Sequence, residues 1–288
     1  MRTLTFFVPD TFDGGKLKTF LRGPCQVSSS ILTRLKWIPN SITVNGESVH
    51  VTQILSAGDT VCLHLPETES QVQPEKLPVA LRYEDEDILL VNKPSHMPVY
   101  PTPGHDRDSL ANGIAFEMAQ RGEPFAFHPI FRLDRNTSGL LVVAKHCYSA
   151  SLLSSGVEKR YYAICEGILS GSGVIDQPIR LKPGHTIQRE VGEGGQRAVT
   201  HWKALRSFSD HTLLEIQLET GRTHQIRVHF SSIGHPLAGD DLYGGSLDKI
   251  GRQALHCGWV SLQHPVTKEQ MEWYQPLPDD MCALLKEE

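Results

Sequence analysis

The spacing of hydrophobic residues changes several times along the chain, and each spacing predicts a different element. Residues 27–38 begin with serines that can cap a helix and then repeat isoleucine and leucine at helical spacing. Apolar residues alternate over 42–51 on both sides of an Asn-Gly pair, which is typical of a β-hairpin. Alternation over 58–65 predicts another strand. Together these elements predict a small α+β domain over residues 1–66.

A second, larger domain is predicted over residues 79–288. It is separated from the first by residues 67–78, which are rich in proline and polar residues and have no periodicity, as in a linker. The continuous apolar run at 88–91 is typical of a strand buried on both faces. Apolar residues then follow helical spacing over 109–121, and Asp108 is the predicted N-cap of this helix.

The rest of the chain predicts more strands than helices. Strands are expected at 140–144, 159–167 and 213–218, and a helix is expected over 223–233, capped by its first residue and ended by Gly234. Strands do not alternate regularly with helices, which argues against a doubly wound parallel sheet. The pattern therefore favours an α+β fold.

Composition places the chain among ordinary globular proteins, with 39% hydrophobic and 21% charged residues. No apolar run approaches the ~20 residues of a membrane helix, and the N-terminus does not have the pattern of a signal peptide. The six cysteines form no Cys-x-x-Cys pair. We therefore expect a reduced, cytoplasmic protein that does not act at a membrane.

The charge is unevenly distributed along the sequence. The whole chain carries a net charge of −5, which argues mildly against a nucleic-acid partner, but residues 1–66 carry six basic and four acidic side chains. Phosphate binding requires local positive charge and not a positive total. Contact with RNA is therefore compatible with the sequence, most directly through the first domain.

The run FRLDRNTSGLLVVAK at residues 131–145 contains the strongest candidate for chemistry. Arg132 and Asp134 are close together in it, and a turn then leads into an apolar strand. A turn that enters a buried strand fixes the backbone before it, so Asp134 is expected on a rigid edge. An isolated Arg-x-Asp would fit a surface ion pair equally well.

The complete run is similar to the R-L-D-x-x-T-S-G-L-x-x-x-A-K signature of the RluA-type RNA pseudouridine synthases. In that family the aspartate is catalytic, which implies this role for Asp134. The resemblance also implies that Arg132 contacts RNA and fills the space left by an extruded base. The family usually has histidine before the arginine, where this chain has Phe131.

Two further blocks resemble the same family. K-x-Y-x-A corresponds to Lys159 and Tyr161, and it implies an aromatic ring beneath the extruded uracil, although a strand tyrosine can equally serve packing. G-R-T-H-Q-I-R implies that Arg227 is the partner of Asp134. Among the basic residues of these blocks, Lys159 and Arg222 are expected to bind RNA.

The first domain resembles the alpha-L RNA-binding module that often precedes the catalytic domain in this family. The resemblance places Arg34 and Lys36 on the helix that meets the RNA backbone. A small α+β domain without any ligand is the alternative. The matching blocks occur in the family's order and span nearly the whole chain.

The family resemblance implies a mixed, largely antiparallel sheet around a central cleft and the isomerisation of uridine in ribosomal or transfer RNA. This reaction needs an ionised Asp134, as nucleophile or as base, and no cofactor. No metal site is expected either, because His224, His229 and His235 are not spaced to share a helix face. We expect a monomer.

Two other functions remain possible from the sequence. A nucleoside or glycoside hydrolase would usually need a second catalytic carboxylate, and within the matching blocks Asp240 is the other candidate. An RNA-binding protein without catalysis would not need the R-L-D, K-x-Y and Q-I-R blocks, which are all intact.

Overall fold

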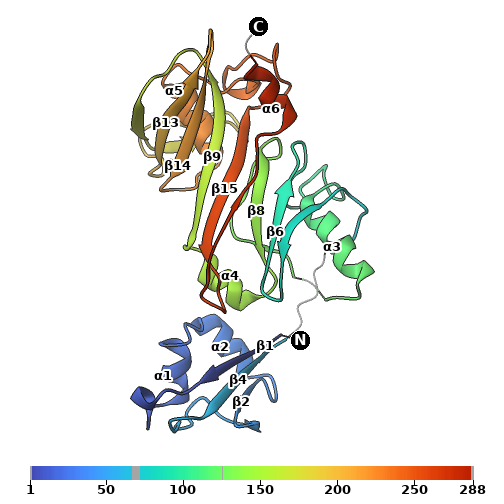
Figure 1. The fold of residues 1–288 in the computed structure, drawn as a ribbon, viewed down its shortest axis with the longest axis vertical. Helices are drawn as coiled ribbons and strands as arrows, with labels where there is room; N and C mark the ends of the chain where they lie inside the picture. The colour runs from blue at the N-terminus through green and yellow to red at the C-terminus, as the bar shows by residue number, and fades with distance from the viewer. Residues whose placement is uncertain (1, 67–71, 125, 287–288) are drawn as a thin grey trace.

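The computed structural model describes residues 2–66, 72–124 and 126–286, and two sheets in it have their own groups of buried side chains (Figure 1). The smaller sheet has four strands in the order β1-β4-β2-β3 and is covered by two short helices. In chain order its elements are β1 (Arg2–Phe7), η1 (Asp10–Phe12), α1 (Leu17–Arg22), α2 (Ser29–Leu35), β2 (Ile42–Val44), β3 (Glu47–Ser48) and β4 (Thr60–Leu65).

The helix predicted over 27–38 is present as the shorter α2. The Ser28 side chain accepts a hydrogen bond from the amide of Ile31 at 3.3 Å, so the predicted serine cap is confirmed. The helix ends at Leu35, and its apolar side packs into the core of the smaller sheet.

The predicted hairpin is present between β2 and β3. Asn45 and Gly46 have φ values of 52° and 86°, the left-handed region that this two-residue turn requires. The second strand of the hairpin ends at Ser48. Val49 and Val51 were expected in it but lie outside, where they pack against the same core.

The larger sheet has ten strands, of which eight follow the order β10-β13-β14-β9-β15-β8-β6-β5, while β16 pairs with β15 and β7 pairs with β8. All described pairs are antiparallel except β8 with β15. The α+β class with a mixed, largely antiparallel sheet is therefore confirmed. The elements of this part are β5 (Ala80–Glu84), β6 (Ile88–Lys93), α3 (Leu110–Gln120), β7 (His128–Pro129), β8 (Ser138–Ala144), α4 (Cys147–Leu153), β9 (Val157–Glu166), β10 (Ser172–Asp176), β11 (Ile179–Leu181), β12 (Arg189–Val191), β13 (Val199–Ser207), β14 (His211–Leu218), α5 (Gln225–Ser232), η2 (Asp241–Tyr243), β15 (Leu255–Gln263), β16 (Gln270–Tyr274) and α6 (Asp279–Leu284).

The parallel contact between β8 and β15 depends on a glycine. Gly139 lies opposite Cys257 with a φ of 115°. A Cβ atom at Gly139 would lie only 2.2 Å from the carbonyl oxygen of Cys257. The two strands can therefore approach this closely only if position 139 has no side chain.

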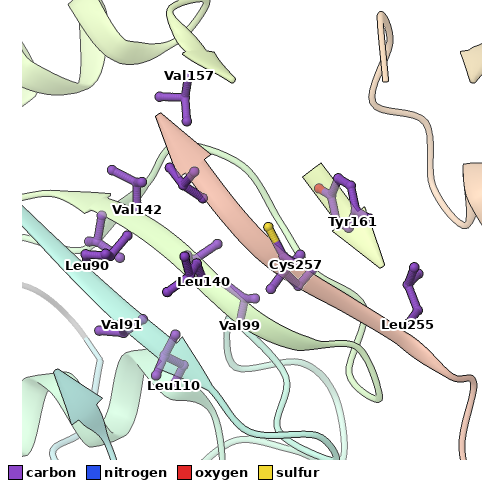
Figure 2. Close-up of a cluster of buried hydrophobic side chains, with 14 of the residues drawn as sticks. Leu90, Val91, Val99, Leu110, Leu140, Val142, Val157, Tyr161, Leu255 and Cys257 are labelled. Carbon is purple, nitrogen blue, oxygen red and sulfur yellow. The ribbon is translucent and has the colours of Figure 1, made fainter. Parts of the chain in front are cut away.

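The main core lies where β6, β8, β9 and β15 meet (Figure 2). All four side chains of the run Ile88–Val91 are fully buried, as predicted from their continuous apolar pattern. Leu140 and Val142 of β8 extend the same cluster, and Cys257 of β15 joins it from the neighbouring strand.

Two predicted helix caps are wrong. Helix α3 begins at Leu110, and its N-cap is Ser109, whereas Asp108 forms an ion pair with His105. Ser109 and Asp108 are both good caps, and the capping box between Ser109 and the third helical residue decides between them. Helix α5 begins after His224 and not at Thr223, although it ends before Gly234 as expected.

The two sheets are joined by contacts at α4, which lies between them in Figure 1. Arg2 of β1 donates from Nε and Nη2 to the carboxylate of Asp87, at 2.9 and 3.0 Å. The hydroxyl of Tyr148 on α4 donates to the carbonyl of Cys25 at 2.9 Å, and its ring belongs to the smaller core. None of the helices in the described ranges is long and apolar enough to cross a membrane.

Candidate active site

Asp134 lies in the loop directly before β8. Leu133 beside it is buried in the main core, and the amide of Thr137 donates to the carbonyl of Asp134 at 3.0 Å to close the turn. Arg132 and Arg135 on either side are exposed. The apolar anchor and the turn hold the Asp134 backbone, so the carboxylate projects from a fixed edge.

Helix α5 brings Arg227 to this carboxylate. Its Nη1 donates to Oδ2 of Asp134 at 3.1 Å, so the structure brings together the two residues that the sequence motifs paired. Within the described residues, the second oxygen of Asp134 accepts no hydrogen bond. The Asp134 side chain is 26% exposed, and Arg227 is 8% exposed. A reacting group can therefore reach the carboxylate while the guanidinium remains covered.

Asp240 holds the other side of the same guanidinium. It accepts from Nε and Nη2 of Arg227 at 2.7 and 2.8 Å in a bidentate pair, and it is almost completely buried. Burial lowers the pKa of Arg227, but its hydrogen bonds and charge interactions with Asp240 and Asp134 outweigh that effect and raise it. Asp240 is thus engaged in orienting Arg227 and is not a free second carboxylate.

Two buried basic residues that the sequence did not suggest fix the loop of Asp134. Lys93, at the end of β6, donates from Nζ to the carbonyls of Pro94, Met97 and Arg135 at 2.9, 2.8 and 3.1 Å. Lys93 therefore ties the residue after Asp134 to the end of β6, a strand of the main core.

Arg252 holds the next residue of the loop. It donates to the carbonyl of Asn136 at 3.2 Å and forms a bidentate pair with Asp280 of α6. These contacts join segments far apart in the chain. In the sequence, the position of Lys93 directly after an apolar run is the one feature that points to either residue. This position does not indicate which carbonyl oxygens the lysine side chain contacts.

Lys93 is also an unusual ionisable group. Burial lowers its pKa to about 7, while the charge of Asp134 acts in the opposite direction. The side chain is fully buried, so it has no access to water. Whether the Lys93 side chain is charged near neutral pH therefore depends on the protein groups around it.

Tyr161 of β9 lies in the main core, 6% exposed, in the same cluster as Leu255 and Cys257 (Figure 2). Burial raises the pKa of its phenol well above the usual value, with smaller contributions from Cys257 and Asp134. The phenol is therefore protonated at neutral pH. Tyr161 is thus a core residue of the large sheet, and its proposed role at the site comes from the motif that it shares with Lys159.

A short network beside Arg227 contains a residue with a left-handed backbone. His224 has a φ of 58°, and its Nδ1 is 2.8 Å from the hydroxyl of Tyr243. That hydroxyl accepts from the amide of Arg189 at 2.9 Å, and the Tyr243 ring lies 5.0 Å from the Arg227 guanidinium carbon. Burial lowers the pKa of His224, which favours the neutral ring. Left-handed non-glycine residues concentrate at functional sites.

The basic residues expected to contact RNA have different surroundings. Arg132 and Arg222 are exposed. Lys159 lies over the ring of Phe131 with Nζ 4.7 Å from its centre, and burial lowers the pKa of Lys159. Phe131, the departure from the family pattern, thus gives this lysine a cation–π partner.

Arg34 and Lys36 lie on the smaller sheet's side of the molecule and are not brought together with Asp134. Both are exposed at the end of α2. Trp37 follows them with 79% of its surface exposed, and Lys36 Nζ lies 5.3 Å from its ring centre. Arg34 also lines a cavity of about 180 Å³ that includes Cys147 of α4.

One group of side chains has the composition of a metal site but is already occupied by hydrogen bonds and ion pairs. Asp85, Asp87 and His264 offer ligand atoms within 4.8 Å of one another. Asp87, however, pairs with the guanidinium of Arg2 and lies 2.8 Å from His146. A cationic group in contact with the carboxylate disfavours a metal ion there, so we interpret the group as an ion-pair network that joins the two sheets.

Comparison with known proteins gives a consistent result. The sequence profile of the family described as RNA pseudouridylate synthase matches residues 87–232. The uncharacterized RNA pseudouridine synthase YjbO of Bacillus subtilis (strain 168) is 42% identical over 92% of this chain and 97% of its own length. The ribosomal large subunit pseudouridine synthase D of Escherichia coli (strain K12) is 36% identical over 76% of this chain and 73% of its own length.

Solved structures agree at the level of the fold. Human RNA pseudouridylate synthase domain containing 4 matches with a TM-score of 0.57 and 26% identity, covering 72% of this chain and 91% of that chain. Human RNA pseudouridylate synthase domain containing 1 gives the same TM-score with 25% identity, covering 70% of this chain and 84% of that chain.

Proposed function

The chain belongs to the RNA pseudouridine synthase family, and from this premise we propose that it converts specific uridines of structured RNA to pseudouridine with Asp134 as the catalytic carboxylate. The observation that carries the proposal is the 3.1 Å contact between Arg227 Nη1 and Asp134 Oδ2, which leaves the second carboxylate oxygen open. The enzyme is an isomerase that acts on RNA.

The reaction breaks the bond between the ribose and a ring nitrogen of uracil and rejoins the same two parts through a ring carbon. That carbon loses its proton and the freed nitrogen gains one, so the net change is an isomerisation. The open oxygen of Asp134 would attack the anomeric carbon or take a proton from the neighbouring ribose carbon. Arg227 fixes the other oxygen and supplies a positive charge, and Asp240 holds Arg227 in place. Both routes use the same carboxylate geometry.

We propose that Tyr161 stacks beneath the extruded base and that Arg132 occupies the position that the base leaves in the RNA. Extrusion costs a few kcal/mol of stacking, and the ring of Tyr161 would restore part of this by lying beneath the uracil. Arg132 is exposed one residue before Leu133, so its guanidinium can enter the vacated position in the RNA. Arg222 and Lys159 would add contacts to the RNA backbone.

The target proposed first is ribosomal RNA, with transfer RNA as the second possibility. Relatives that cover most of this chain are named ribosomal large subunit pseudouridine synthase D, which supports ribosomal RNA. RNA recognition depends on loop shape and on unpaired bases, so the particular uridine is set by surfaces outside the catalytic pair.

We also propose the division into domains that the sequence suggested. Residues 1–66 would be an alpha-L-type RNA-binding domain, 67–78 a linker that lies partly outside the described residues, and 79–288 the catalytic domain. The separate sheets and cores support this division. The exposed Arg34 at the end of α2 and the exposed Lys36 directly after it would supply the positive charge that RNA backbone contact needs.

The test is the Asp134→Asn substitution in the full-length chain. Asparagine keeps the side-chain shape but removes the negative charge, so we expect normal thermal unfolding, retained RNA binding and no detectable pseudouridine. Pseudouridines are first mapped by chemical labelling in the RNA of cells with and without the gene, and the identified RNA is then used in vitro.

Asp248→Asn is the matched control, because Asp248 is an exposed aspartate in the loop after η2. It should retain full activity. Substantial isomerase activity in Asp134→Asn would contradict the proposed mechanism. Release of free uracil by the wild type would indicate a hydrolase, and RNA binding without any base change would indicate an RNA-binding protein without catalysis.

A further inference from the structure

A cavity of about 310 Å³ lies beside the candidate active site, and of its lining residues Arg222 alone has been given a role above. It is bordered by the β11–β12 hairpin on one side and by the segment before α5 on the other. Three arginines and two adjacent glycines line it: Arg180, Arg189, Arg222, Gly194 and Gly195. We call these five residues the arginine pocket.

The arginine pocket has a net positive charge even when the ion pair that neutralises one of its arginines is taken into account. Arg180 forms an ion pair with Glu190 at 2.8 Å. Within the described parts of the chain, neither Arg189 nor Arg222 forms an ion pair. Arg222 donates from Nε to the carbonyl of Arg197, which leaves its two terminal nitrogens for a ligand. Two guanidinium charges therefore remain without a negative partner.

Arg189 supplies the second observation. Its Nε is buried and has no hydrogen-bond partner in the described chain. Buried polar atoms usually have a partner, and an orphaned donor costs roughly 1–3 kcal/mol. The simplest explanation of an unpaired donor beside a cavity is a ligand in the cavity that accepts the missing hydrogen bond.

The shape and the donors fit a phosphate group. Guanidinium groups bind phosphate through two parallel hydrogen bonds, which a lysine cannot do. Gly194 has a φ of 76°, and neither it nor Gly195 adds a side chain to the cavity wall. Successive residues of this kind let the backbone approach an anion closely.

The pocket is also connected to the catalytic pair. The amide of Arg189 donates to the hydroxyl of Tyr243, and the ring of Tyr243 lies against Arg227, which contacts Asp134. We propose that the arginine pocket binds one backbone phosphate of the substrate RNA close to the nucleotide held at Asp134. This inference rests on the proposed function, because the phosphate source it assigns is the RNA substrate.

The test uses the full-length protein and short oligocytidylates that contain one central uridine. In each oligonucleotide, one phosphate is replaced by an uncharged methylphosphonate. With wild-type protein, replacement at one position should weaken binding about tenfold or more, as expected for lost hydrogen bonds to a charged group. The double variant Arg189→Met/Arg222→Met should bind the unmodified RNA more weakly by a similar factor and should be insensitive to the same replacement.

Arg121→Met is the matched control. It removes one guanidinium from the end of α3, near the opposite edge of the large sheet, and should behave like the wild type. If the double variant unfolds, Arg222→Met alone keeps the test, because Arg222 is exposed. It should show the same insensitivity at the same phosphate.

Equal losses in the wild type and the variants at every phosphate would overturn the inference. Competition by inorganic phosphate in the absence of any methylphosphonate effect would also overturn it, because the pocket would then bind a free anion. All measurements are of binding, so they do not require turnover. A failure of the proposed function, seen as no pseudouridine formed, is therefore distinguishable from a failure of the pocket.

Discussion

The two oxygens of Asp134 have different surroundings, and this difference defines the candidate site at the scale of single residues. Oδ2 is held by Arg227, whereas the other oxygen is open within the described chain. Arg227 is in turn fixed by the buried Asp240. A hydrolase that needs a second free acid is disfavoured by this arrangement, because the nearest other carboxylate is already bonded on both oxygens.

Tyr161 tests whether a core residue also serves as a platform for the base. Its hydroxyl donates no hydrogen bond among the described residues, so Tyr161→Phe should keep the ring, the stability and most of the single-turnover rate. Tyr161→Leu keeps apolar bulk but removes the flat ring, and it should lose about 1–3 kcal/mol of transition-state stabilisation, the usual range for base stacking.

Both variants are compared by single-turnover kinetics and by thermal unfolding. Leucine is chosen over alanine because a cavity in the core would cost roughly 3–5 kcal/mol of stability and obscure the result. Equal single-turnover rates in the two variants would return Tyr161 to a purely structural role.

Lys93 gives a prediction about pH. Its pKa is about 7 in the folded protein, whereas that of an unfolded chain is close to the ordinary ~10.4. Between these values the unfolded chain holds a proton that the folded protein has released, so the free energy of unfolding should rise as pH increases. At about 1.4 kcal/mol per pKa unit, the rise is up to ~5 kcal/mol.

Denaturant unfolding of the wild type and of Lys93→Met at several pH values across this window measures the effect. The methionine variant lacks the titrating group and should not have this component of the pH dependence. Parallel curves for the two proteins would show that Lys93 has an ordinary pKa in the folded state.

At the scale of elements, the site depends on where β8 and β15 meet. This is the parallel pair in a sheet that is otherwise antiparallel, and the loop of Asp134 leads directly into it. Gly139 permits the close approach, while Lys93 and Arg252 tie the loop to β6 and α6. The position of the Asp134 carboxylate is therefore fixed by four separate segments, β6, β8, β15 and α6.

Gly139→Ala should destabilise the protein strongly. The new Cβ would collide with the carbonyl of Cys257, and the φ of 115° adds backbone strain, so we expect a loss of more than ~3 kcal/mol. Gly171→Ala is the control, because Gly171 also has a left-handed φ but nothing lies within 4 Å of its Cβ position.

The control should lose only the ~1–2 kcal/mol that a left-handed backbone costs. The free energies of unfolding of both variants, measured with denaturant, distinguish the cost of backbone strain from the cost of forcing β8 and β15 apart. A similar loss in the two proteins would mean that β8 and β15 can move apart easily.

The sequence was informative where a pattern is local or carried by a motif. The pairing of Asp134 with Arg227 followed from motif resemblance, and the buried strand at 88–91 followed from its apolar run. The loop anchors Lys93 and Arg252 could not be predicted, because they bind backbone carbonyls of distant segments. Neighbouring candidates for a cap were also not separable by spacing alone.

At the scale of the whole molecule, the basic residues proposed to contact RNA are divided between two regions. The exposed Arg34 lies in the last turn of α2 and the exposed Lys36 directly follows the helix, and Trp37 beside them offers an open ring for stacking. The remaining candidates, Arg132, Lys159 and Arg222, belong to the larger part of the chain that also holds Asp134 and Arg227. The overall negative charge is thus compatible with RNA binding, because the proposed contacts depend on local positive charge.

The full-length variant Arg34→Met/Lys36→Met should bind substrate RNA more weakly and with a shallower dependence on salt. Each lost phosphate contact lowers the slope of log K against log salt by about 0.7–0.9. Lys286→Met, an exposed substitution near the C-terminal end, is the control and should leave the slope unchanged. An unchanged slope in the double variant would exclude phosphate contact by α2.

The Arg252–Asp280 ion pair has a consequence for how the chain folds while it is being synthesised. The loop of Asp134 is pinned through Arg252, and Arg252 is held by helix α6 near the C-terminal end. A nascent chain emerges at roughly 5–20 residues per second, so the carboxylate is produced well before its clamp arrives. A chain truncated before α6 should therefore fold much of its sheet, but its Asp134 loop should be held less firmly because Arg252 lacks Asp280.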